Sequence, residues 1–124
     1  MKKLTDNTFN DVLNNSDALK LIKFHAAWCN PCQLQKLIVN DLVDELPYCE
    51  FYGVDVQEET GITAKFIVNS LPTMLLFKGN DLIDRRQGFM AKNQLKLWIE
   101  DADLAYKLKK REGSKEVEID INNL

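Results

Sequence analysis

The sequence contains little cysteine and histidine and has no long apolar segment. Its three cysteines are too few to staple a small fold with disulfide bonds, and their number is odd. No apolar run is long enough to cross a bilayer, and the two lysines after Met1 are not followed by the apolar stretch of a signal peptide. We therefore expect a cytoplasmic protein that does not enter the membrane.

The charged residues show no large excess of one sign. The formal net charge is -3 over 124 residues, whereas a nucleic-acid-binding protein usually presents a basic face. We therefore expect no binding to nucleic acid. The length suits a single domain, and a hydrophobic content of 45% is enough to build one core.

Patterns of apolar residues and turn residues predict alternating helices and strands. We expect strands over residues 20–26, 50–56, 73–77 and 82–87, and helices after Thr5 or Asn7, over 30–46, near 59–68 and from Ala91 or Lys92 onward. Asn69 is expected to stop the short helix in a left-handed conformation, and Gly113 to end the last one. The early alternation predicts parallel strands, and the late hairpin adds an antiparallel edge. The expected fold class is α/β, with a mixed sheet of four to five strands and helices on both faces.

The segment after Gly113 is a separate feature. Val117, Ile119 and Ile121 alternate with acidic and amide residues, which is the period-two pattern of a half-buried strand. An acidic terminus that frays fits the same residues. We therefore divide the chain into a domain over residues 1–112 and a tail over residues 113–124. Whether the tail forms an extra strand, paired with a sheet edge or another chain, stays open.

Two cysteines, Cys29 and Cys32, are separated by two residues and lie between a predicted strand and a predicted helix. The free N–H groups and the positive dipole end of the helix stabilise a thiolate on Cys29. A thiolate is the form that attacks a disulfide. Cys29 is therefore expected to form a mixed disulfide with a substrate, and Cys32 to release it. This redox-active pair needs no bound cofactor.

The chain resembles the thioredoxin family over about residues 4–105. The segments that carry the resemblance are Phe24–Cys32, with its Trp-Cys-Asn-Pro-Cys motif, Val54–Val56, Leu71–Thr73, Leu75–Gly79 and Gly88. The resemblance implies the thioredoxin fold and a protein dithiol–disulfide reductase that serves electron transport and cell redox homeostasis. Its partners would be disulfide-containing protein substrates and, as electron donor, thioredoxin reductase. We expect a monomer.

The same resemblance implies which residues surround the cysteine pair. It implies a cis peptide bond before Pro72, packed against the active disulfide. It also implies that the backbone of Leu71 pairs with the extended chain of the substrate. The implied docking surface consists of Trp28, Asn30, Pro31, Leu71, Pro72, Gly88 and Phe89.

Two positions beside the cysteines depart from the usual family pattern. Asn30 replaces a glycine, which predicts a changed redox potential whose sign the sequence does not give. Lys23 replaces a buried aspartate that is thought to move a proton to and from the second cysteine. Either the Lys23 ammonium lies near Cys32 and favours a thiolate there, or it snorkels to solvent. We assign tuning of the pair to Lys23, Asn30, Pro31 and Pro72.

The single histidine and the third cysteine invite other assignments. We expect His25 to be a structural residue and Cys49 to be a buried, inert thiol. Together with Cys29 and Cys32 they could form a Cys₃His zinc set, but the spacing does not resemble that of a zinc finger. We therefore expect no metal.

Two other functions compete with a reductase. A glutaredoxin would carry a tyrosine after the motif proline and a different, glutathione-binding hairpin, and this chain has neither. A thioredoxin-like binding or assembly module, in which redox activity is incidental, stays open as the alternative. The departures at Lys23 and Asn30 and the long tail are the features that keep this alternative in view.

Overall fold

The computed structural model describes the backbone of residues 1–118 and the side chains of residues 1–111. One mixed sheet forms its centre, with the strand order β1-β3-β2-β4-β5. The strands are β1 (Lys2–Lys3), β2 (Leu19–His25), β3 (Cys49–Asp55), β4 (Thr73–Lys78) and β5 (Asp81–Gln87). The helices are α1 (Phe9–Asn14), α2 (Asn30–Glu45), α3 (Thr60–Lys65) and α4 (Lys92–Glu118).

Strand β2 is the central strand and is held by a neighbour on each side. It runs parallel to β3, with Leu19 beside Cys49 and His25 beside Asp55, and antiparallel to β4. Strand β5 continues the sheet as an antiparallel hairpin with β4. The predicted α/β class, with parallel strands first and an antiparallel edge last, is therefore confirmed.

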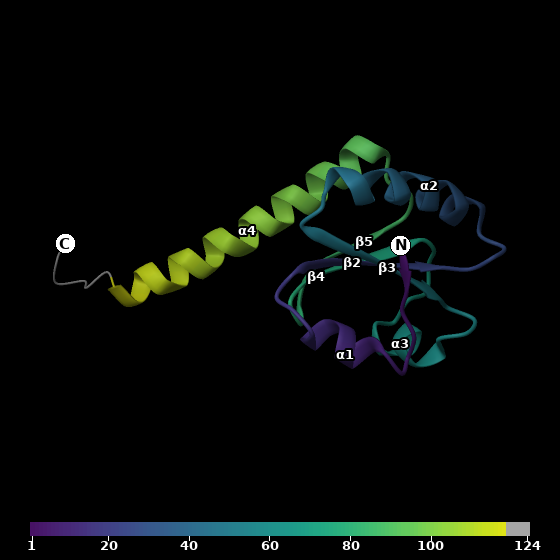
Figure 1. Cartoon of the computed structure of the whole chain (residues 1–124), viewed down its shortest axis with the longest axis horizontal. Coiled ribbons are helices and arrows are strands. Elements are labelled where there is room, and N and C mark those ends of the chain that lie inside the picture. The colour runs from purple at the N-terminus through teal and green to yellow at the C-terminus, as the bar shows by residue number, and fades with distance from the viewer. Residues whose placement is uncertain (119–124) are drawn as a thin grey trace.

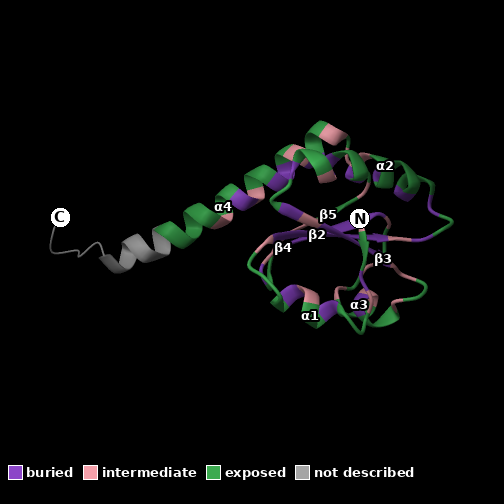
Figure 2. Cartoon of the chain, in the orientation of Figure 1, coloured by how far each residue is buried: buried purple, intermediate pink, exposed green. Residues whose placement is uncertain are grey.

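The helices form a layer on each face of the sheet (Figure 1), and the buried residues lie between these layers (Figure 2). Helices α2 and α4 cover one face, where Leu19 and Leu21 of β2 join their core. Helices α1 and α3 cover the other, where Ile22 and Phe24 lie. Successive residues of a strand point to opposite faces, so the almost unbroken apolar run of β2 supplies both cores.

Several predicted boundaries are wrong. Strand β1 was not expected, and it pairs in parallel with β3 at Lys2 and Lys3. Helix α3 is shorter than residues 59–68, and Ile67, not Asn69, has the positive φ of 51° after it. A bonded turn explains the shift, because the backbone N–H of Ile67 donates to Ala64 and fixes the chain reversal earlier.

Helix α4 does not end at Gly113 but continues to Glu118, and its second half extends well beyond the domain (Figure 1). Residues 113–118 of the predicted tail are thus helical rather than a strand. The rest of the proposed strand, residues 119–124, lies outside the described residues. None of the described helices is both long enough and apolar enough to span a membrane.

Candidate functional site

Cys29 and Cys32 form a disulfide bond where β2 passes into α2, with their Cα atoms 5.3 Å apart. Cys29 occupies the N-cap of α2, and the backbone N–H of Cys32 donates to Cys29 Sγ over 3.3 Å. Pro31 lies in the first helical turn, where its missing N–H costs little. The helix start therefore aims its free donors at Cys29, as the sequence predicts.

The disulfide is largely buried, because only 5% of Cys29 and 1% of Cys32 is exposed. Both sulfur-bearing residues pack against Ala26, Val56 and Leu71. The pair is therefore largely covered in the disulfide state. Cys29 also lines a groove beside the disulfide.

That groove has a volume of about 510 Å³ and lies directly beside the disulfide. It brings together four residues of the expected docking surface, namely Trp28, Asn30, Pro31 and Leu71. Trp28 is 67% exposed, which is unusual for so large an apolar side chain. The rest of the lining consists of residues that sequence reasoning did not select, Val56, Thr63, Val68, Asn69 and Ser70.

The other three expected docking residues lie around the turn before β4 and the end of β5. The Leu71–Pro72 bond is cis, as the family resemblance implies. Pro72 itself is buried, and its carbonyl accepts a 2.8 Å hydrogen bond from the backbone N–H of Gly88. Gly88 has φ of 90°, a conformation that favours glycine, and Phe89 beside it is exposed.

Lys23 does not reach solvent, because only 2% of it is exposed. Its Nζ donates a 2.8 Å hydrogen bond to the backbone carbonyl of Cys32. Burial, followed by the nearby charge of Lys36, lowers the pKa of Lys23 to about 8. Snorkelling is thereby excluded, and the alternative that places the ammonium beside Cys32 holds.

His25 lies two residues further along β2 and is partly buried. Burial and then the charge of Lys23 lower the pKa of His25. Its Nδ1 is buried and has no hydrogen-bond partner among the described residues. Its ring lies close to the backbone of Gly53, where a Cβ would come within 3.2 Å of Cε1. This close packing supports a structural histidine.

The four residues of the zinc alternative do not come together. Cys49 pairs with Leu19 at one end of β2, whereas His25 and the disulfide lie at the other. Among the described residues, no group of three or more His, Cys, Asp or Glu side chains is placed to hold a metal ion. Cys49 is buried, and burial raises the pKa of its thiol to about 12.

Sequence reasoning missed Gln35, a fully buried residue of α2. Its side chain donates to the carbonyl of Met90 over 3.0 Å and accepts from the N–H of Met90 over 2.8 Å. The loop after Gly88 is thus joined to the helix that carries Cys32. The available signal was a polar residue three positions after Cys32 and four before Val39, on a helix face whose other buried residues are apolar.

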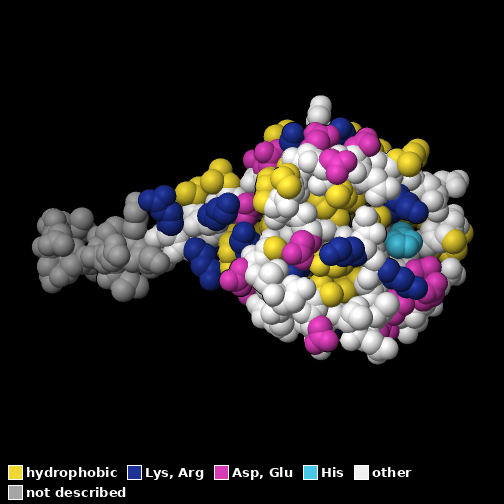
Figure 3. Space-filling view, viewed as in Figure 1, with side chains coloured by type: hydrophobic (Ala, Val, Ile, Leu, Met, Phe, Trp, Pro, Cys, Tyr) yellow, Lys and Arg dark blue, Asp and Glu magenta, His cyan; other side chains and the backbone are white. Residues whose placement is uncertain are grey.

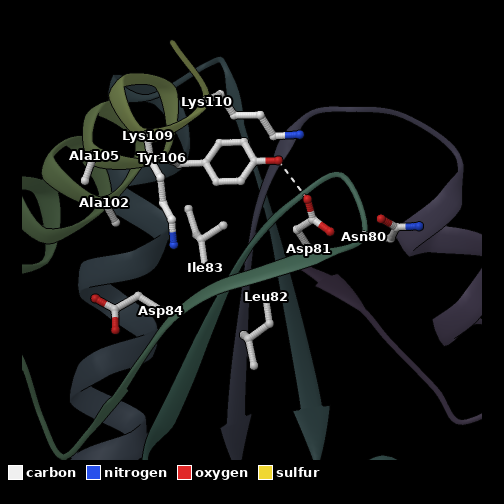
Figure 4. A pocket seen from close by; sticks show the side chains of 10 residues that line it. All are labelled: Asn80, Asp81, Leu82, Ile83, Asp84, Ala102, Ala105, Tyr106, Lys109 and Lys110. Carbon is white, nitrogen blue, oxygen red and sulfur yellow. Dashed lines mark hydrogen bonds between the residues drawn. The ribbon is translucent and has the colours of Figure 1, made fainter. Parts of the chain in front are cut away.

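A larger hollow, of about 920 Å³, lies away from the cysteines, where α4 leaves the β4–β5 hairpin (Figure 4). Tyr106 donates a 2.7 Å hydrogen bond to Asp81 across it, and Lys109 and Lys110 project from the same helix. It contains no thiol and none of the predicted site residues.

A family model described as Thioredoxin matches residues 1–101. The chain is 38% identical over 102 residues to "Thioredoxin Y2, chloroplastic" of Arabidopsis thaliana, covering 82% of this chain and 61% of that protein. It is 30% identical over 96 residues to a thioredoxin of Mycoplasmoides gallisepticum, covering 77% of this chain and 96% of that protein. The chain thus spans about three fifths of the length of the chloroplastic relatives Y2 and Y1.

The fold has equally clear counterparts among solved structures. A thioredoxin from Fasciola hepatica superimposes with a TM-score of 0.76 at 31% sequence identity. The match covers 82% of this chain and 99% of that one.

Proposed function

Because this chain belongs to the thioredoxin family, we propose that it is a disulfide oxidoreductase that reduces disulfide bonds in protein substrates. The observation that carries the proposal is the position of Cys29. Cys29 is the N-cap of α2, and its Sγ accepts a hydrogen bond from the backbone N–H of Cys32. Its disulfide lies at the edge of an apolar groove. A helix N-terminus and a nearby donor both favour the thiolate that attacks a disulfide.

The reaction proceeds by two exchanges. The thiolate of Cys29 attacks one sulfur of the substrate disulfide, forms a mixed disulfide, and releases the other substrate sulfur as a thiolate that takes up a proton. Cys32 then loses its proton and attacks Cys29 Sγ. The Cys29–Cys32 bond forms, and the second substrate sulfur leaves. The substrate gains two electrons and the cysteine pair loses two, so a dithiol donor must reduce the pair again.

The groove beside the disulfide supports an extended polypeptide as the substrate. Trp28 and Leu71 both line it, Trp28 with a broad exposed apolar surface and Leu71 packed against the cluster that holds Cys29. We propose that the docking surface continues from this groove toward the end of β5 through Pro72, Gly88 and Phe89. The backbone of Leu71 would pair with the substrate chain and hold its disulfide over Cys29.

Three residues next to the disulfide are proposed to tune it. Pro31 stiffens the first turn of α2, and Asn30 places a polar side chain where the family pattern has glycine. The third is Lys23, whose ammonium is hydrogen-bonded to Cys32. Pro72, the buried residue that precedes β4, is the fourth residue to which tuning is assigned.

The remaining expectations also stay proposals. We propose that the protein acts as a monomer, and that thioredoxin reductase supplies the electrons without a cofactor bound here. The cytoplasmic location stays a prediction of the sequence, and the names of two relatives place those proteins in chloroplasts. Fractionation of cells that express the chain tests the location.

Reduction of insulin with a dithiol donor tests the function. We expect turnover by the wild-type protein and none by Cys29→Ser, whereas Cys49→Ser serves as the matched cysteine control and should retain turnover. Equal rates for wild type and Cys29→Ser would instead favour a binding module whose redox chemistry is incidental.

A further inference from the structure

A second hollow, of about 540 Å³, lies behind the disulfide, on the side of Cys32. Its deepest lining comes from β2 and α2, with Lys23 and His25 from the strand and Cys32 and Lys36 from the helix. Figure 3 shows the only histidine of the chain at the surface, flanked by basic and acidic side chains. This hollow has no part in the proposed docking of the substrate.

Lys23 is the buried cation of this hollow. Its one hydrogen bond to protein goes to the carbonyl of Cys32, and among the described residues it forms no ion pair. A buried ammonium without a carboxylate partner is unusual, because desolvation of the charge is offset only by close opposite charge or several hydrogen bonds. The disulfide state of this protein therefore leaves Lys23 without a counter-charge.

The other charged groups around the hollow do not supply one. Lys36 of α2 is cationic and disfavours the charged form of Lys23. Of the acidic groups, Glu58 forms an ion pair with Lys3 at 3.1 Å, and Asp55 accepts the N–H of Gln57 over 2.8 Å. The remaining titratable groups on lining residues are His25, whose Nδ1 has no described partner, Lys2 of β1, and the N-terminal amine of Met1.

Reduction of the disulfide provides the missing opposite charge. We propose that Lys23 is a positioning residue whose ammonium stabilises the thiolate of Cys32, so that Lys23 and Cys32 share one proton in the reduced protein. The inference deepens the proposed reductase function, in which Cys32 must lose its proton before it resolves the mixed disulfide. The family pattern places an acid at this position, whose charge would act on Cys32 with the opposite sign.

The proton balance follows from this pairing. When two electrons break the Cys29–Cys32 bond, both sulfurs become thiolates: the start of α2 stabilises that of Cys29, and protonated Lys23 lies beside that of Cys32. When Cys32 attacks Cys29 again, the thiolate charge beside Lys23 disappears, Lys23 can release its proton to solvent, and the departing substrate thiolate takes up a proton from solvent. In the disulfide state burial and Lys36 lower the pKa of Lys23 to about 8, and an adjacent thiolate raises it again.

The direct test is the titration of a single thiol. In the double variant Cys29→Ser, Cys49→Ser only Cys32 remains, and its thiolate is followed by absorbance at 240 nm. Adding Lys23→Met is expected to raise the apparent pKa of Cys32 by about one unit, the size of an ordinary charge–charge effect. Lys20→Met is the matched control, since Lys20 is equally buried on the same strand but faces α1 and should not move the titration.

A measurement on the wild-type protein makes the test independent of whether Lys23→Met folds. The side-chain NMR signals of Lys23 are titrated in the oxidised and in the reduced protein, with Lys20 as internal reference. We expect the midpoint of Lys23 to be higher in the reduced protein and that of Lys20 to be unchanged. Equal midpoints for Lys23 in both states, or equal effects of the two methionine variants on Cys32, would overturn the proposal. Neither result depends on insulin reduction, which tests the reductase function separately.

Discussion

Gln35 and Met90 are joined by two hydrogen bonds between the buried side-chain amide of Gln35 and the backbone N–H and carbonyl of Met90. The bonds connect residues far apart in the sequence. They fix the loop that carries Gly88 and Phe89 against the helix that carries Cys32. The docking surface and the redox centre therefore keep a set distance from each other.

Removal of this connection is expected to destabilise the protein. Gln35→Met keeps the volume but leaves two backbone groups of Met90 without partners, which should lower the free energy of unfolding by about 2 kcal/mol in urea titrations. Gln33→Met is the control on the exposed side of the same helix and should change it by less than about 0.5 kcal/mol. A similar loss in both variants would show that the amide bonds to Met90 are unimportant.

The lowered pKa of Lys23 predicts a pH dependence of stability in the oxidised protein. The folded protein binds fewer protons at Lys23 than the unfolded chain between its pKa of about 8 and the ordinary value of 10.5. Stability therefore rises with pH through this range. Relative to Lys23→Met, the wild type should gain about 2 kcal/mol between pH 7 and pH 9.5. Urea unfolding of both proteins at the two pH values checks this, and a constant difference would contradict it.

Trp28 is expected to contribute to docking of protein substrates rather than to sulfur chemistry. Trp28→Ala should raise KM for insulin about tenfold, because the loss of an aromatic anchor in an interface typically costs more than 1 kcal/mol. The rate with the small disulfide 5,5′-dithiobis(2-nitrobenzoate) should stay within about twofold. Leu97→Ala removes a similarly exposed apolar residue near the start of α4, which does not line the groove, and should affect neither. A parallel loss with both substrates would place Trp28 in the chemistry itself.

The thiol of Cys49 is expected to be unreactive toward alkylating reagents in the folded protein. Its buried thiol, with a pKa of about 12, presents almost no thiolate at pH 8. Iodoacetamide should therefore leave Cys49 unmodified in the native reduced protein, whereas denatured protein should gain three adducts by mass spectrometry. Native modification at Cys49 would mean that this end of β3 opens.

The start of α2 was predictable because its signals are local. The spacing of Cys29 and Cys32, the proline between them and the apolar period that follows all lie within a few residues. Strands β2, β3 and β4 were recognisable for the same reason, as short apolar runs bounded by turn residues, and β5 as the return of a hairpin after the turn that follows β4. The prediction of the redox centre thus needed only neighbouring residues.

Other features depend on partners distant in the sequence. Strand β1 is only two lysines long, has no periodicity, and becomes a strand only by pairing with β3. The position of Lys23 could not be decided either, because a lysine has an apolar stem and a polar end, and its partner is a carbonyl in the next element. The predicted end of α4 at Gly113 was wrong because a single glycine destabilises a helix by only about 1 kcal/mol, and good helix formers flank it on both sides.

Lys20 and Lys23 are three residues apart on β2, so they serve opposite layers of the molecule. The strand itself is held by backbone bonds to β3 and β4, which do not depend on the side chain at position 23. Substitution of Lys23 alone can therefore replace the cation behind the sulfurs by a neutral or acidic group, while the backbone of the sheet and the groove beside the disulfide stay unchanged. The charge beside Cys32 and the residues that line the substrate groove therefore lie on different parts of the fold. Either can evolve or be engineered while the other stays the same.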